Sequence, residues 1–274
     1  MSTQVGAHAR DGAVGLPREI APGVFWLGDC LKVRYQGRLL HAYNSVYVLA
    51  GDDCSMVIEA GHPQDLQTIE AQLESLIADG LPELRYVFLT HTETPHCAGV
   101  GRLLERYPSV VACGDVSDLH LVFPQFTDRF VRLDPGDEID LGGTRFVAVE
   151  AVFRDLVTTR WGFDTRRRVL FAGDGFSYSH YHDEGHCGAL AEEADELALP
   201  DMVALFAELA FYWTRFVDLD PYIERLDELL RRELDVALIA PTHGLPLGDP
   251  ERTLPTIYEG LRLGKRRAGT EQVT

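Results

Sequence analysis

Apolar residues occur along the chain in short runs that are separated by Gly, Pro and Asp turn signals, a pattern typical of strands. The runs expected to form strands or hairpins cover residues 24–28, 31–40, 46–51, 55–61, 84–89, 110–114, 146–152, 155–163, 168–171 and 236–240. Apolar residues recur at helical spacing within residues 63–78, 100–107, 200–217 and 220–230. The pattern therefore predicts one mixed α/β domain over residues 19–262, with flexible ends at 1–18 and 263–274.

Composition narrows the classes of partner and compartment. The 274 residues carry a formal net charge of −18, which argues against nucleic acid and anionic membranes as partners. No apolar stretch reaches the length of a membrane span. The five cysteines include no CxxC pair, so they are expected to be reduced thiols in a cytoplasmic protein. Cys97 and Cys187 are neighbours of the candidate site described next.

Two imidazoles and a carboxylate follow the apolar run 84–89 within six residues, as His91, Glu93 and His96. Ligands bind at the carboxyl ends of strands in open α/β sheets. Thr94 is expected to cap a helix that begins at Pro95, and this turn would bring His96 back toward the other two side chains. The segment therefore predicts a metal site. A carboxylate among the ligands favours iron or manganese, whereas imidazoles alone, or with thiolate, suit zinc.

The motif Thr-His-x-x-x-x-His-x-x-Gly after a strand resembles the metallo-β-lactamase superfamily. The His-x-Glu-x-x-His within it is similar to the flavodiiron proteins and the stand-alone oxygen-binding diiron proteins. Residues 43–49, 170–174 and 240–244 resemble further family strands, and the resemblance extends over residues 20–247. It implies an αββα sandwich, and the chain is expected to be too short for the flavodoxin domain that flavodiiron proteins carry in addition. It also implies two irons, with Asp174 as the bridging ligand, held by His91, Glu93, His96, Asp174 and His243.

The sequence departs from the family at two ligand positions. Pro95 stands where the family has an aspartate, and no histidine occurs between residues 146 and 155, where the middle ligand is expected. One alignment places Val152 at that position and an ungapped count places Asp155 there. Asp155 is thus a further ligand candidate, as are three residues of the polar loop after Asp174, namely His182, Glu184 and His186. Glu59 occupies a family aspartate position that orients the loop without binding metal.

These features favour a non-heme diiron monooxygenase that hydroxylates a bulky apolar substrate, of the kind found in natural-product biosynthesis. Dioxygen would be the co-substrate, Glu93 and Asp174 the catalytic residues, and a separate reductase the electron donor. The aromatic-rich segment 200–217 is expected in core or homodimer packing, or alternatively as a wall of the substrate pocket. The alternatives are an oxygen-binding or oxygen-reducing diiron protein, a zinc or manganese hydrolase of a thioester or lactone, and a scaffold that has lost its metal.

Overall fold

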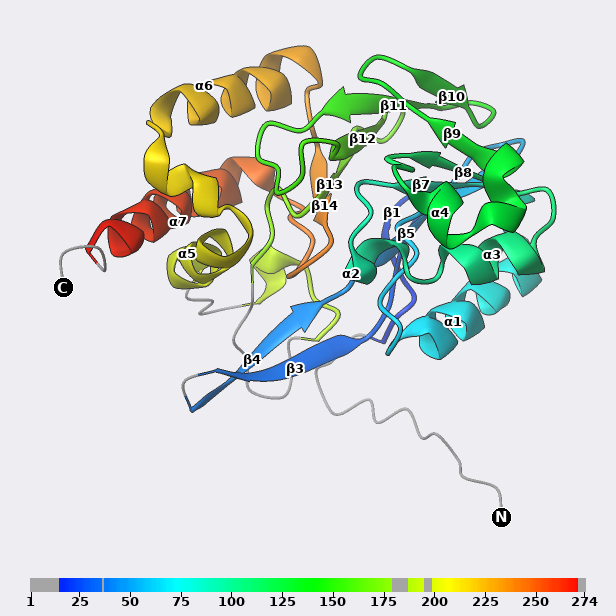
Figure 1. The fold of residues 1–274 in the computed structure, drawn as a ribbon, viewed down its shortest axis with the longest axis horizontal. Helices are drawn as coiled ribbons and strands as arrows, with labels where there is room; N and C mark the ends of the chain where they lie inside the picture. The colour runs from blue at the N-terminus through cyan, green and yellow to red at the C-terminus, as the bar shows by residue number, and fades with distance from the viewer. Residues whose placement is uncertain (1–14, 36, 179–186, 195–198, 271–274) are drawn as a thin grey trace.

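The computed structural model describes residues 15–35, 37–178, 187–194 and 199–270. Two sheets face each other and helices cover their outer faces (Figure 1). The larger sheet has the strand order β1-β2-β5-β6-β7-β8-β9. Its strands are Arg18–Ala21, Val24–Leu27, Val46–Ala50, Ser55–Ile58, Leu84–Leu89, Val111–Gly114 and Phe130–Arg132. The expected αββα sandwich of the metallo-β-lactamase type is confirmed by this arrangement.

The smaller sheet has the order β10-β11-β12-β13-β14, in which only β13 and β14 are parallel neighbours. Its strands are Glu138–Asp140, Arg145–Glu150, Arg160–Asp164, Val169–Gly173 and Leu238–Pro241. A separate hairpin of β3 (Cys30–Tyr35) and β4 (Arg38–Tyr43) projects beside the two sheets (Figure 1). This hairpin is the one expected from residues 31–40.

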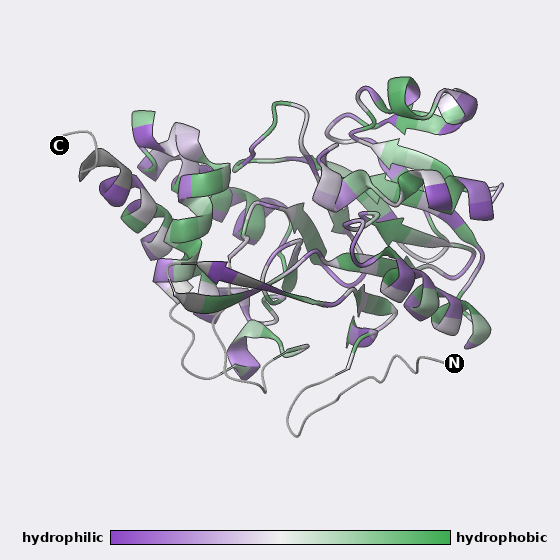
Figure 2. Ribbon diagram, turned by 60° about the horizontal axis from the view of Figure 1, so that its bottom comes forward, coloured by the Kyte–Doolittle hydropathy of each residue, from purple (hydrophilic) through white to green (hydrophobic). Residues whose placement is uncertain are grey.

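Alternation of side chains along the strands divides the core into two layers. On β5, Tyr47 belongs to the core between the sheets, whereas Val46 and Val48 belong to the core under the helices. Aromatic rings join the sheets: the ring centroids of Phe88 and Phe146 are 4.8 Å apart in an edge-to-face contact. Figure 2 shows the strands mainly in the hydrophobic colour, with hydrophilic residues on the covering helices.

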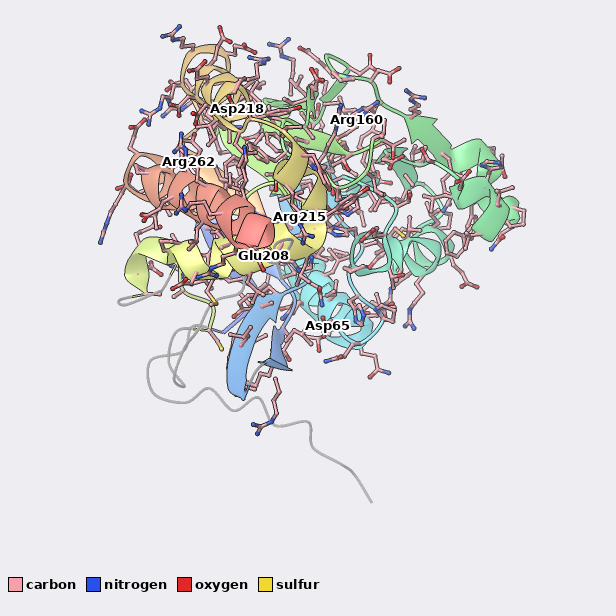
Figure 3. All side chains as sticks on the ribbon, turned by 60° about the vertical axis from the view of Figure 1, so that its left-hand side comes forward. Asp65, Arg160, Glu208, Arg215, Asp218 and Arg262 are labelled. Carbon is pink, nitrogen blue, oxygen red and sulfur yellow. The ribbon has the colours of Figure 1, made fainter. Side chains whose placement is uncertain are left out.

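The covering helices belong to two groups. The larger sheet is covered by α1 (Leu66–Ala78) and α3 (Val100–Arg106), with the short helices α2 (Thr94–Cys97) and α4 (Leu119–Val122) nearby. The smaller sheet is covered by α5 (Leu199–Ala210), α6 (Asp220–Glu228) and α7 (Pro250–Thr270). Arg262 lies on the outer side of this group (Figure 3), where its Nη2 is 2.8 Å from Asp220 Oδ1. Short 3₁₀ or π segments occupy Pro124–Arg129, Ala191–Glu193, Tyr212–Phe216 and Leu229–Glu233.

Regular structure extends beyond the predicted bounds of the domain at both ends. Helix α7 continues to Thr270, through most of the segment expected to be a flexible tail. Glycines bring α7 close to α5: a Cβ added at Gly260 would lie 2.5 Å from Val203 Cβ. The Lys265 ammonium also donates a 2.5 Å hydrogen bond to the Val217 carbonyl. At the other end, strand β1 already begins at Arg18.

Two local expectations are corrected by the structure. The apolar segment 200–217 is one helix only to Ala210, and a 3₁₀ turn follows it. Helix α2 begins at Thr94 with Glu93 as its N-cap residue, so Pro95 lies in the first turn and Thr94 is not the cap. Within the described residues, no helix combines the length and the apolar character that crossing a bilayer requires.

Candidate metal centre

The side chains of the centre come from loops at one edge of both sheets. His91 and Glu93 follow β7, and His96 lies in α2 directly after them. Asp174 follows β13 and His243 follows the neighbouring parallel strand β14. The two sheets are joined here, because the Ser45 backbone N–H beside β5 donates to the Thr242 carbonyl at 2.8 Å. Carboxyl ends of parallel strands thus deliver the residues that the sequence had placed together.

Asp174 lies between two imidazoles from different parts of the chain. Its Oδ1 is 3.3 Å from His96 Nε2 and 3.5 Å from His243 Nε2. His91 completes a group with His96 and Asp174 whose ligand atoms all lie within 4.8 Å of one another. All three residues of this group are buried. The central position of Asp174 is the one that a bridging carboxylate requires.

A second group shares His91 and adds two carboxylates, those of Glu93 and Asp155. The His91 Nε2 is 3.3 Å from Asp155 Oδ2, while the Thr159 hydroxyl donates a 3.1 Å hydrogen bond to Asp155 Oδ1. Val152, the alternative residue for the missing middle ligand, packs against the apolar core instead. The fold therefore brings Asp155 to the site, in agreement with the ungapped count.

Buried polar atoms at the centre lack the hydrogen bonds that such atoms normally have. Within the described chain, no hydrogen-bond partner reaches His91 Nε2, His96 Nε2 or Asp174 Oδ1. Most buried polar atoms in proteins are paired, and the binding of an ion is a common reason for an exception. Nitrogen and carboxylate oxygen atoms that converge without hydrogen bonds between them fit a divalent cation.

Sequence comparison places this centre within a known superfamily. The family pattern described as "Metallo-beta-lactamase superfamily" matches residues 42–243. The chain belongs to this superfamily. A curated relative, the type A flavoprotein fprA of Rhodobacter capsulatus, is 26% identical over 250 residues, which are 85% of this chain and 53% of the relative. The chain thus spans about half the length of that relative.

Solved structures of the flavodiiron type have the same fold. The rubredoxin oxygen:oxidoreductase of Desulfovibrio gigas aligns with a TM-score of 0.71 at 12% identity, over 90% of this chain and 61% of that one. The flavodiiron protein of Giardia intestinalis aligns with a TM-score of 0.62 at 17% identity, over 92% of this chain and 59% of that one. The His-x-Glu-x-x-His motif led us to expect neighbours of this type, and at these identities they show the fold alone.

A buried layer of oxygen atoms holds the imidazoles of this metallo-β-lactamase domain from behind. The Glu59 carboxylate accepts hydrogen bonds from the hydroxyls of Thr90 and Thr242, and its Oε1 is 3.2 Å from His96 Nδ1. The Tyr43 carbonyl is 2.5 Å from His243 Nδ1. Such outer contacts fix the ring orientation and the tautomer of metal-binding histidines. Glu59 therefore has the position expected for an orienting residue.

The electrostatics at His243 also favour a cation. When Nδ1 donates to the Tyr43 carbonyl, Nε2 of a neutral ring presents its lone pair toward Asp174 Oδ1. Burial lowers the pKa of His243 below its ordinary value, and the attraction of Asp174 only partly offsets this effect. The neutral ring is therefore favoured. Two electron-rich atoms then face each other at 3.5 Å, an arrangement that a positive ion between them would stabilise.

The pKa values of His96 and Asp174 shift so that the charged form of each is favoured, unlike that of His243. Burial lowers the pKa of His96, but the carboxylates of Glu59 and Asp174 outweigh burial and raise it to about 10. Burial raises the pKa of Asp174, but the imidazoles of His243 and His96 outweigh burial and hold it well below its ordinary value. Without a cation, the centre therefore keeps a proton on His96 at neutral pH. A metal that binds His96 must displace that proton.

The structure gathers most of the residues that the sequence singled out. His91, Glu93, His96, Asp155, Asp174 and His243 lie around the centre. His182, Glu184 and His186 lie outside the described residues, so their role stays a prediction, as does the ligand role of the others. Sequence reasoning missed the Tyr43 carbonyl, because a backbone atom leaves no residue-type signal.

Proposed function

We propose that this protein is a non-heme diiron oxidoreductase that activates dioxygen. The observation that carries the proposal is the convergence of three carboxylates and three imidazoles at the strand ends of both sheets. Zinc sites usually contain nitrogen and sulfur ligands, whereas a set rich in carboxylates suits iron or manganese. Among the described residues, no cysteine belongs to the groups around His91. The ligand chemistry therefore favours iron over zinc.

The residues divide into two sides around Asp174. His91, Glu93 and Asp155 would hold one iron, His96 and His243 the other, and Asp174 would bridge them. The iron pair, when bound, supplies the binding and reduction of dioxygen by electrons from an external donor. The protein shields the centre from bulk water, since both His91 and His96 are at most 1% exposed. Glu59 and the Tyr43 carbonyl keep the two imidazoles His96 and His243 in place.

Within this class we propose hydroxylation of an apolar organic substrate. The Phe206 ring of α5 lies against the His243 imidazole, with ring centroids 5.4 Å apart, so one side of the centre is apolar. The reaction consumes one substrate molecule, dioxygen, two electrons and two protons, and it yields the hydroxylated product and water. A separate reductase must supply the electrons. The exposed apolar residues beyond Phe206 suit either a substrate wall or a homodimer contact, namely Leu209, Tyr212 and Phe216.

Reduction of dioxygen without an organic substrate is the second candidate. It is favoured by the name of the structural neighbour from Desulfovibrio gigas, a rubredoxin oxygen:oxidoreductase. That reaction takes four electrons and four protons per dioxygen and yields two waters. The two candidate reactions share the iron centre and differ in the products that contain the oxygen atoms of dioxygen.

The experiment begins with protein made without added zinc and loaded with ferrous iron under nitrogen. The proposal predicts about two irons per chain and iron-dependent consumption of labelled dioxygen. His96→Ala and His243→Ala are expected to lose iron, while His120→Ala, which changes an exposed imidazole of α4, keeps it. Label in an organic product supports hydroxylation, and label only in water supports reduction. A zinc-only protein without iron-dependent activity contradicts both and favours the hydrolase alternative.

A further inference from the structure

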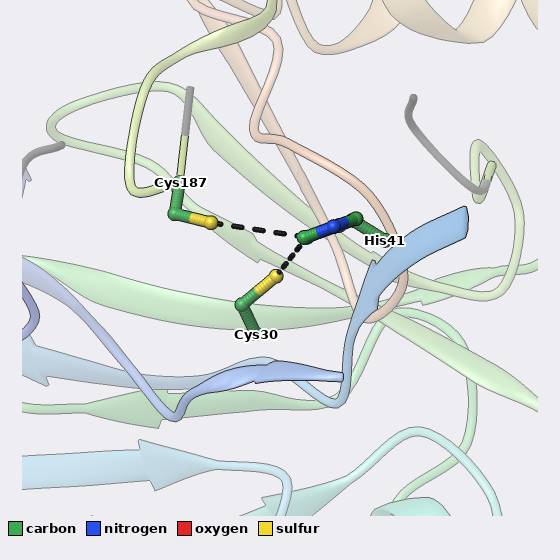
Figure 4. A group of neighbouring side chains, drawn as sticks. All are labelled: Cys30, His41 and Cys187. Carbon is green, nitrogen blue, oxygen red and sulfur yellow. Dashed lines mark hydrogen bonds between the residues drawn. The ribbon is translucent and has the colours of Figure 1, made fainter. Parts of the chain in front are cut away.

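A second cluster of metal-binding side chains lies at the β3–β4 hairpin, apart from the residues of the iron-type centre. Cys30 begins β3, His41 lies on β4, and Cys187 comes from a distant segment that returns to the hairpin. In the hairpin, His41 is opposite Lys32, two residues from Cys30, so Cys30 and His41 lie on the same face. Figure 4 shows both thiol groups directed at one imidazole.

The distances in this cluster suit tetrahedral coordination. The Cys30 Sγ is 2.8 Å from His41 Nδ1, and the Cys187 Sγ is 3.9 Å from the same nitrogen. The three ligand atoms all lie within 4.8 Å of one another. Sulfur and nitrogen ligands of a tetrahedral zinc ion are about 3.5 Å apart. The two observed distances lie on either side of that value, so a small movement of one thiol group admits the ion.

The backbone beside Cys187 is fixed from two sides. The Gly188 N–H donates a 2.8 Å hydrogen bond to the Tyr43 hydroxyl, and the Arg18 guanidinium donates a 2.7 Å hydrogen bond to the Gly188 carbonyl. His41 is 2% exposed, whereas both cysteines are half-buried and accessible to an ion from solvent. The cluster is therefore held in place before any ion binds.

The charges also match a divalent ion. The hydrogen bond with the Cys187 thiol, together with burial, raises the pKa of Cys30 above its ordinary value. A divalent cation would displace one proton from each thiol and leave a neutral unit of two thiolates, one imidazole and the ion. Soft thiolate ligands favour zinc and similar cations over magnesium or calcium.

We propose that Cys30, His41 and Cys187 form a binding site for one zinc-type cation, distinct from the iron-type centre. Three protein ligands leave the fourth tetrahedral position for water or another donor. The ion would tie the segment after residue 186 to the hairpin. Tyr43 connects the two centres, because its hydroxyl binds Gly188 and its carbonyl binds His243. The site does not depend on the proposed oxygen chemistry.

The test titrates the full chain with Co²⁺ after purification without oxygen. Thiolate ligation gives cobalt an intense charge-transfer absorption in the near ultraviolet, and in the part of the chain that the structure describes the groups around His91 contain no sulfur. We expect about one equivalent of cobalt to produce the band in the wild type. Cys30→Ser and Cys187→Ser are expected to abolish it, and Cys54→Ser, which changes another half-buried cysteine, to retain it. Absence of the band in the wild type, or its persistence in Cys30→Ser, overturns the proposal.

A second measurement uses the wild type and therefore does not depend on how the variants fold. Zinc is expected to slow the alkylation of Cys30 and Cys187 at least tenfold, while Cys54 reacts at an unchanged rate. Equal protection of all three residues, or protection of none, contradicts the site. A Cys30–Cys187 disulfide in protein isolated without oxygen would also contradict the site, because the pair would then be a redox element. Mass spectrometry detects this disulfide as the loss of two hydrogens.

Discussion

The proton held by His96 gives a prediction about metal affinity. The imidazole lies between the Glu59 and Asp174 carboxylates, which raise its pKa to about 10 despite burial. At pH 7 the metal-free centre therefore keeps this proton, and a metal that binds His96 must release it. Because the bound proton competes with the metal, affinity rises with pH as long as the pH is below the pKa of the metal-free state.

The magnitude follows from the same pKa. A group with a pKa of about 10 lowers apparent metal affinity at pH 7 by about 1000-fold, or about 4 kcal/mol. Affinity for the first zinc equivalent should therefore rise about tenfold per pH unit, or about 100-fold between pH 6 and 8. Competition with a chelator gives the affinities, and calorimetry in buffers of different ionisation enthalpy should count about one released proton. The Cys30→Ser/Cys187→Ser background removes thiol protons from the count.

The variant Glu59→Gln tests whether the Glu59 carboxylate is a cause of the raised His96 pKa. It removes one of the two charges that raise the His96 pKa, so the dependence of log affinity on pH should flatten toward the upper end of this range. Loss of an outer ligand contact also weakens affinity by about 10–100-fold at every pH. The slope, and not the absolute affinity, therefore reports the proton. Glu105→Gln changes an exposed carboxylate of α3 and should leave the slope unchanged. Equal slopes in wild type and Glu59→Gln, or no pH dependence in the wild type, would refute the reasoning.

Three further predictions concern a ligand, a tight turn and the apolar wall. Asp155→Ala should weaken iron binding at least tenfold in a ferrous titration, and Asp155→His should restore much of the affinity. Val152→Ala should leave the affinity unchanged. Equal effects of the two alanine variants would argue against Asp155 as a ligand. Gly173→Ala should lower the free energy of unfolding by about 1–3 kcal/mol more than Gly136→Ala in urea denaturation. Both glycines have positive φ, but only at Gly173 would the new Cβ meet another atom, the Thr90 hydroxyl oxygen at 2.7 Å. Equal losses of unfolding free energy in the two variants would show that the structure relieves this contact. Phe206→Ala should keep the bound iron and lower the yield of hydroxylated product per dioxygen consumed, and an unchanged yield would exclude a role in substrate binding.

The sequence was sufficient where the signal is local and periodic. The run Leu84–Leu89 is a strand with the expected ends, because an apolar run bounded by turn residues has few other stable placements. The positions of His91, Glu93 and His96 follow from it, since a parallel strand delivers its next residues to the ligand-binding edge. The proximity of Asp174 and His243 followed from the resemblance of residues 170–174 and 240–244 to family strands, and no periodic pattern in the sequence predicts it.

Contacts between distant loops could not be predicted in this way. The choice between Val152 and Asp155 depends on how the loop between β11 and β12 folds back, which no periodic pattern records. The cluster of Cys30, His41 and Cys187 was also missed, because its members are 11 and 146 residues apart in the chain. The extent of α7 depends on close packing of its glycines against α5, and glycines near the end of a helix normally predict its termination.

The two departures from the family pattern offset each other once the fold is known. Replacement of the family aspartate by Pro95 removes one carboxylate beside His96, and Asp155 adds one beside His91 in place of an imidazole. The centre therefore retains three carboxylates, Glu93, Asp155 and Asp174, with one imidazole fewer than the family pattern implies. Both carboxylates other than Asp174 now lie on the His91 side, so the hard oxygen ligands are concentrated around one metal position. The His96 and His243 side is left with nitrogen ligands and a share of Asp174, a set that holds a divalent ion less selectively for iron. The two proposed metal positions would thus be chemically unequal.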